Sequence, residues 1–178
     1  SLRRRQRQMC IRDRYHPEEV NYYLKRDFFR EYSANGSLFL SENCSLKDCD
    51  NLIIYGHHMN SGKMFAALEG YRERKFFKEH PFIFFNTLQG EEKYQVFAVF
   101  STPVYTGSDF AYYTFTKAEN RKSYETFIEA VKERSFYDTG ITADYGEKLL
   151  TLSTCEYSQE NGRLVVVAKK IAEKEITK

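Results

Sequence analysis

The sequence predicts a mainly β protein, a mixed or antiparallel β-barrel with short helices and one longer helix inserted between late strands. Several short runs of aromatic and β-branched residues are bounded by turn-forming residues, which is typical of strands. One longer segment has the i, i+3, i+4, i+7 apolar spacing of an amphipathic helix. Strands and helices do not alternate regularly, which argues against a doubly wound parallel sheet.

The individual elements follow from these patterns. The apolar residues from Met64 to Tyr71 recur at helical spacing and predict a short helix over one end of the sheet. A second periodic run, Tyr124 to Val131, predicts the longer helix over about 118–134. The expected strands are 37–40, 52–55, 82–86, 94–100, 148–154 and 164–168.

Composition limits the classes of protein that this chain can be. With 178 residues it suits one domain that buries a core without disulfides or metals. The formal net charge is only +2, and beyond residue 14 the chain is slightly acidic, so no nucleic-acid surface is expected. No apolar run approaches the roughly 20 residues that span a bilayer.

Residues 1–14 differ in composition from the rest, because they are rich in arginine and lack apolar periodicity. We interpret them as a non-native or disordered leader, the alternative being a basic tail that binds anionic surfaces. The folded domain is expected to occupy residues 15–178.

Four cysteines are too few for a disulfide framework in a chain of this length. Cys44 and Cys49 also lack the spacing and the nearby histidines of a zinc site, so we expect structural or incidental roles for them. No cofactor is expected.

Three residues stand where strands are predicted to begin or end. Cys155 closes a predicted strand and could act as a nucleophile, although most free cysteines are small buried hydrophobes. His57 follows an apolar strand and Gly56, where it could act as an acid/base or be simply structural. Arg163 opens the last strand eight positions after Cys155, so a hairpin would bring the two together. The alternative for Arg163 is an exposed residue of an edge strand.

Together these segments resemble the sortase family, and specifically its class B. The resemblance rests on the segments Ile54–Met59, Thr151–Tyr157 and Arg163–Val167, which read IYGHHM, TLSTCEY and RLVVV. It extends from about Asn21 to Ile171, and the longer helix favours class B.

The resemblance assigns roles to individual residues. It implies a catalytic set of His57, Cys155 and Arg163, with His58 standing where class B enzymes often have asparagine. It also implies a sortase catalytic domain over 15–178 and an N-terminus truncated before the segment Tyr22–Leu24, so that the membrane anchor is missing. The residues that it places near the substrate are Tyr55, Ser153, Glu156, Tyr112 and Tyr113.

The implied reaction is a transpeptidation. Cys155 would cleave a C-terminal sorting signal of the NPxTN or SPxTG type, form a thioester, and pass the acyl group to a peptidoglycan amine. The enzyme would work on the outer face of the membrane of a Gram-positive-type bacterium. The alternatives are a cysteine hydrolase that releases the acid to water, a pilus-assembly sortase and a catalytically silent peptide-binding module.

Overall fold

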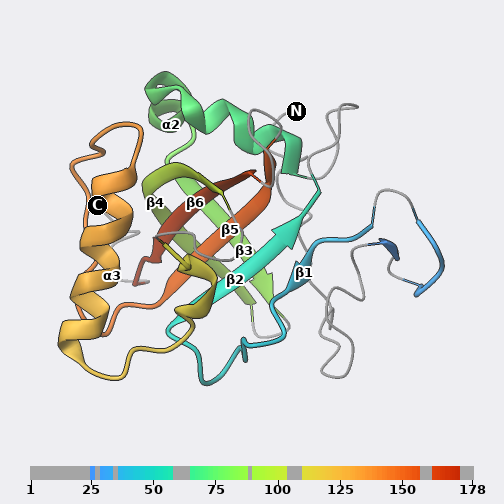
Figure 1. Cartoon of the computed structure of the whole chain (residues 1–178), viewed down its shortest axis with the longest axis horizontal. Helices are drawn as coiled ribbons and strands as arrows, with labels where there is room; N and C mark the ends of the chain where they lie inside the picture. The colour runs from blue at the N-terminus through green and yellow to red at the C-terminus, as the bar shows by residue number, and fades with distance from the viewer. Residues whose placement is uncertain are drawn as a thin grey trace.

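Six strands form one curled sheet in the order β1-β2-β5-β6-β4-β3 (Figure 1). The computed structural model describes residues 25–26, 29–33, 36–57, 65–87, 90–103, 110–156 and 162–172, without the side chains of Cys155 and Glu156. The leader 1–14, the segment 22–24 and His58 lie outside the described residues. The strands are Phe39–Leu40 (β1), Asn51–Gly56 (β2), Phe82–Thr87 (β3), Gly90–Pro103 (β4), Leu149–Glu156 (β5) and Gly162–Lys170 (β6).

The pairing of the strands is mixed, as predicted. β2 and β5 run parallel, whereas β1 with β2, β3 with β4, β4 with β6 and β5 with β6 are antiparallel. A parallel pair requires a long crossover, and residues 57–148 provide it. That crossover includes the strands β3 and β4 and the helices Phe65–Arg72 (η2), Arg74–Glu79 (α2) and Arg121–Arg134 (α3).

The predicted helix after Met64 is a 3₁₀-helix, Phe65–Arg72 (η2), followed by a separate α-helix, Arg74–Glu79 (α2). Met64 itself lies outside the described residues. The break falls at Glu73, whose extended backbone begins α2. A β-carbon at Gly70 would meet the Phe76 ring at 2.7 Å, so the turn of the chain packs closely here. The predicted helix ends at Tyr71 and does not include α2, in which Phe77 is the buried residue, so that no apolar period marks it.

The longer helix is confirmed as Arg121–Arg134 (α3). It begins three residues later than predicted because Asn120 is extended and caps it, accepting a hydrogen bond from the Ser123 N–H at 2.9 Å. The Ser123 side chain completes the capping box. A short 3₁₀-helix, Tyr112–Thr114 (η3), precedes it.

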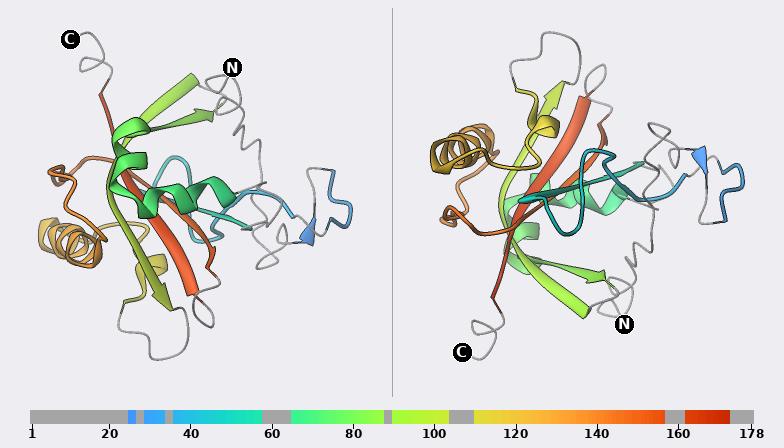
Figure 2. Two further views of the ribbon diagram at one scale, coloured as in Figure 1. Left: turned by 90° about the horizontal axis from the view of Figure 1, so that it is seen from above. Right: turned by 90° about the horizontal axis from the view of Figure 1, so that it is seen from below.

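Helices cover both faces of the sheet, and each face has its own apolar core. Figure 2 shows α3 on one side of the sheet and η2 with α2 on the other. The core under η2 includes Phe65 and Leu68 with Leu152 and Val166 of the sheet. The core under α3 includes Tyr124, Phe127, Ile128 and Val131 of the helix with Val165 and Val167 of the sheet.

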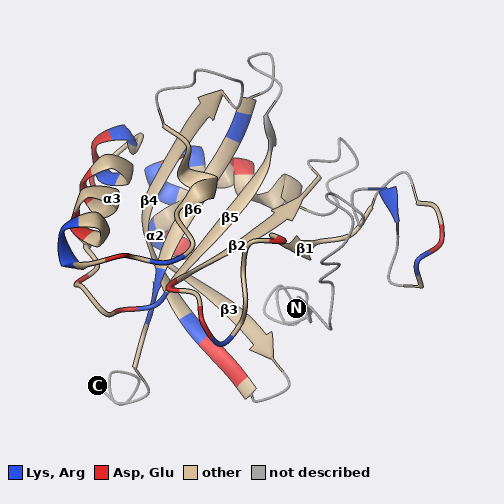
Figure 3. Cartoon of the chain, turned by 60° about the horizontal axis from the view of Figure 1, so that its bottom comes forward, with Lys and Arg blue, Asp and Glu red and all other residues tan. Residues whose placement is uncertain are grey.

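Charged residues lie mostly outside this layered core. Figure 3 shows the middle of the sheet almost free of charge, with basic and acidic residues along α3 and near the ends of strands. Within the described part of the chain, no helix combines the length and the hydrophobicity that crossing a membrane demands.

Asp50 ties three segments together at the start of β2. Its carboxylate accepts hydrogen bonds from the Ala118 N–H at 3.0 Å and from the Lys148 ammonium at 2.8 Å. Its carbonyl accepts from the Leu149 N–H at 2.7 Å. Partial burial opposes ionisation, but the bonds from Lys148 and Ala118 and the nearby Lys117 outweigh it and lower the pKa of Asp50.

Replacing Asp50 by asparagine should therefore lower the free energy of unfolding by about 1 kcal/mol at neutral pH. Because the folded-state pKa is depressed, this stability is present above about pH 4 and is lost as pH falls through the folded-state pKa. Urea unfolding of Asp50→Asn and of the parent should differ at pH 7 and converge in strong acid. Asp48→Asn, at a nearby exposed aspartate, is the matched control and should change little. A difference that persists in strong acid would contradict this role.

Candidate active site

His57, Cys155 and Arg163 lie at the same end of three adjacent strands. In the β5–β6 hairpin Cys155 pairs directly with Arg163. In the β2–β5 pair Gly56 is in register with Thr154, so His57 and Cys155 are the next positions of the two chains. Neighbouring strands are about 4.8 Å apart, which places the three backbones within about 10 Å. The predicted hairpin is confirmed, and the chemical roles of the three residues stay predictions.

The position of His57 is determined by close packing around the glycine before it. A β-carbon on Gly56 would collide with Leu38 Cδ2 and would lie 2.7 Å from Phe65 Cδ2. The His57 carbonyl accepts a hydrogen bond from the Phe65 N–H at 3.0 Å, at the first residue of η2. The half-buried His57 is thus held between the end of β2 and the start of η2.

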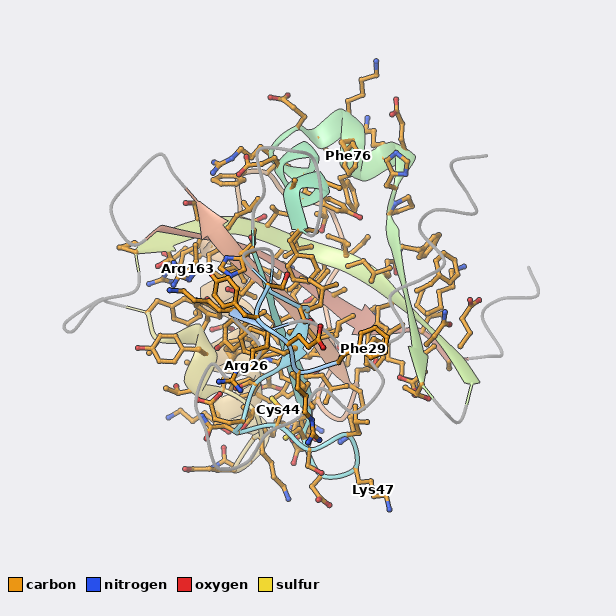
Figure 4. All side chains as sticks on the ribbon, turned by 90° about the vertical axis from the view of Figure 1, so that its right-hand side faces the viewer. Arg26, Phe29, Cys44, Lys47, Phe76 and Arg163 are labelled. Carbon is orange, nitrogen blue, oxygen red and sulfur yellow. The ribbon has the colours of Figure 1, made fainter. Side chains whose placement is uncertain are left out.

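Arg163 supplies a positive charge at the start of β6. Its side chain is half-buried, and its Nη1 donates to the Gly162 carbonyl at 3.0 Å. Figure 4 shows Arg163 well away from Cys44, which lies beside the start of β2. The guanidinium gives this end of the sheet a positive charge and a planar set of hydrogen-bond donors.

Three of the five residues expected near the substrate lie together: Tyr55, Tyr112 and Ser153. Ser153 is two residues before Cys155 on β5, so the two residues are on the same face of the strand. The hydroxyl groups of Tyr112 and Ser153 are 2.6 Å apart, and both side chains are buried. Tyr55 pairs with Ser153 in the parallel register. Burial, with smaller contributions from Tyr112 and Glu42, raises the pKa of Tyr55 well above its ordinary range, so its phenol stays neutral.

The other two expected substrate residues are placed less fully. Tyr113 is half-buried and meets the Tyr112 ring edge-on, with centroids 5.6 Å apart. Glu156 pairs with Gly162 through its backbone, and its side chain is outside the described part. The role of all five residues in binding substrate stays a prediction.

The sequence reasoning missed two features of this region. The contact of Leu38 with Gly56 joins segments from different parts of the chain, and no local pattern indicates it. The Thr154 hydroxyl is buried next to Cys155 and, within the described part of the chain, has no hydrogen-bond partner. Such an orphan group is costly in a protein interior, and only the folded packing reveals it.

No set of three or more His, Cys, Asp or Glu residues suited to a metal ion occurs in the ranges that the structure describes. The strand register brings an imidazole, a thiol and a guanidinium to neighbouring strand ends. Such a set suits acyl transfer through a covalent intermediate.

Comparison with known proteins identifies the family. A sortase domain model matches residues 19–171. Sortase B of Staphylococcus aureus (strain NCTC 8325 / PS 47) is 36% identical over 150 residues, which are 83% of this chain and 59% of that protein. This chain thus spans less than two thirds of that relative.

Solved structures agree in fold. The structure described as a Staphylococcus aureus sortase B-substrate complex superposes with a TM-score of 0.77 at 35% identity, covering 86% of this chain and 70% of that one. A sortase B complexed with triglycine gives a TM-score of 0.79 at 33% identity, covering 89% and 73%. The curled, mainly β sheet with few short helices matches sortase B structures, which confirms the predicted fold class. This chain belongs to the sortase family, in its class B.

Proposed function

We propose that this chain is a cysteine transpeptidase that acts on the sorting signals of surface proteins. The observation that carries the proposal is the strand register, which brings His57, Cys155 and Arg163 to one end of the sheet. A sortase B relative has been solved with a substrate, which supports a peptide of the sorting-signal type. We assign an NPxTN-like or SPxTG-like motif to the sorting signal that this chain would cleave.

The first half-reaction forms a thioester. The Cys155 thiolate attacks the carbonyl carbon of the scissile amide, and the carbonyl electrons move onto oxygen. As the tetrahedral intermediate collapses, the C–N bond breaks and the His57 imidazolium gives its proton to the departing amine. The acyl group is then held on the sulfur of Cys155.

The second half-reaction transfers that acyl group. The incoming amine attacks the thioester carbonyl while neutral His57 takes its proton, and the C–S bond breaks to restore the thiolate. We assign a peptidoglycan amine as the acceptor, and the relative solved with triglycine supports a glycine-type amine. The reaction would occur at the outer face of the membrane of a Gram-positive-type bacterium.

Arg163 would stabilise the oxyanion of both tetrahedral intermediates. It faces Cys155 across the hairpin register, and each fixed donor to an oxyanion is typically worth about 3 kcal/mol of transition-state stabilisation. Tyr55, Ser153, Glu156, Tyr112 and Tyr113 would shape the peptide site. The buried Tyr112 and Ser153 would support its floor through their mutual hydrogen bond.

The direct test incubates the full chain with NPxTN and SPxTG peptides and triglycine, and follows the products by mass spectrometry. We expect the ligated peptide and a thioester adduct on Cys155. Cys155→Ala should lower turnover more than about 1,000-fold, and His57→Ala should do the same, because each removes a group that the steps require. His58→Ala is the matched control and should be mild. Release of free acid alone, with triglycine present, would instead indicate a hydrolase.

Arg163→Ala should lower kcat/KM by about 100-fold to 1,000-fold, since one oxyanion donor is lost. Arg163→Lys keeps the charge but lacks the planar fork of donors, so it should recover only a small part of that loss. Circular dichroism must first show that both variants are folded. Near parental activity of Arg163→Lys would show that charge alone suffices.

Gly56→Ala should lower kcat/KM by about 100-fold, because the added methyl group displaces the chain that holds His57. Gly140→Ala is the control for stability. The backbone φ of 74° at Gly140 makes an alanine there strained, but its β-carbon would meet nothing within 4 Å. It should lower the thermal midpoint and leave kcat/KM unchanged. Equal kcat/KM losses in the two variants would contradict a positioning role for Gly56.

A further inference from the structure

The loop from Ser41 to Asp50 is folded around two sulfur atoms. The Cys44 thiol lies 3.5 Å from the Asn51 carbonyl, to which it donates, and its sulfur accepts from the Ile53 N–H at the same distance. The Cys49 sulfur accepts from the Ser45 N–H at 3.1 Å. The two cysteines are only 3% and 8% exposed, so both belong to the interior of the loop.

Cys44 completes the hydrogen bonding at the edge of β2. The antiparallel pairing with β1 covers only Tyr55 and Ile54, and the Ser41 N–H then donates to the Ile53 carbonyl at 2.8 Å. Farther along, β1 has ended, and the Cys44 sulfur meets the backbone of β2 in its place. The position of this sulfur is therefore fixed by the sheet.

A single turn of the loop brings the Cys49 sulfur to the backbone next to Cys44. The Cys49 N–H donates to the Ser45 carbonyl at 3.2 Å, which closes that turn. The Ser45 nitrogen is two bonds from the Cys44 Cα, so the Cys49 sulfur lies within about 6 Å of that atom. The Cys49 thiol also donates to the Asn43 carbonyl at 3.7 Å, so the Cys49 sulfur lies against the backbone on both sides of Cys44.

The electrostatics agree with close approach of the two thiols. Burial raises the pKa of Cys44 to about 12, and the neighbouring Cys49 contributes to the increase. Both cysteines are free in this structure.

We propose that Cys44 and Cys49 are a modification site, at which a disulfide-type oxidant joins them in an intramolecular disulfide. Cys49, the more exposed of the two, attacks the oxidant R–S–S–R and releases one thiol R–SH. Cys44 then displaces the second R–SH from the mixed disulfide. The two cysteines lose two electrons and two protons, and the oxidant gains them as two thiols.

The disulfide would strengthen the loop without reaching the active site. Cys44 contacts Asn51 and Ile53, near the start of β2, whereas His57 follows the other end of that strand. The six residue steps of extended chain from Asn51 to His57 span about 20 Å. The proposal rests on the loop geometry alone and is independent of the reaction proposed for Cys155.

Trypsin provides a direct test, because Lys47 lies between the two cysteines. Cleavage after Arg30, Lys47 and Lys63 gives peptides 31–47 and 48–63, which carry one cysteine each. The full chain bearing Cys155→Ala is treated while folded with oxidised glutathione, then alkylated, unfolded and digested. We expect the two peptides to be joined and to separate on reduction. The thermal midpoint of the oxidised protein should rise by about 5 °C.

Cys44→Ser is the matched control: it should abolish both the joined peptides and the rise in thermal midpoint. Recovery of 31–47 and 48–63 as separate, alkylated or glutathionylated peptides would overturn the proposal. So would joining that occurs only when the oxidant is added to unfolded protein, because the folded loop would then not bring the thiols together.

Discussion

The parallel pairing of β2 with β5 is the constraint on which the rest of this structure depends. It joins segments about a hundred residues apart, with Asn51 opposite Leu149 at one end and Gly56 opposite Thr154 at the other. Because side chains alternate along a strand, a shift of the register by one residue would move every side chain of the strand to the opposite face of the sheet. The same register brings His57 level with Cys155, so folding and the assembly of the site are determined together.

Polar contacts at the far end of the pair hold that register. Asn51 is fully buried, and its amide oxygen accepts from the Thr151 hydroxyl at 2.8 Å while its NH₂ donates to the Phe115 carbonyl at 2.8 Å. Asp50 binds Lys148 and Ala118 alongside it. A shifted pairing would leave these groups buried without partners, which is costly. The polar contacts that fix the register thus lie at one end of β2 and β5, and the proposed chemistry lies at the other.

The two faces of the sheet are covered by different helices. The helix α3 covers one face of β4 and β6 through Tyr124, Phe127 and Ile128, and the second face is already covered by η2 and α2. The sheet is therefore buried on both sides. Its open ends are the places where functional groups remain accessible, as in many folds with sites at strand ends.

Patterns in the sequence predicted the strands and the longer helix, and the resemblance to sortases supplied the three residues of the proposed catalytic set. Alternation, helical spacing and the hairpin between Cys155 and Arg163 are local properties, separated by few residues, so a linear pattern can contain them. Only the tertiary structure decided that His57 stands level with Cys155, that Leu38 and Phe65 pack around Gly56, and that Cys44 and Cys49 are buried in one loop at the edge of β2. The physical reason is that these contacts depend on which strands pair and in which register. That choice is made by the burial of both faces of the sheet at once, which no single segment encodes.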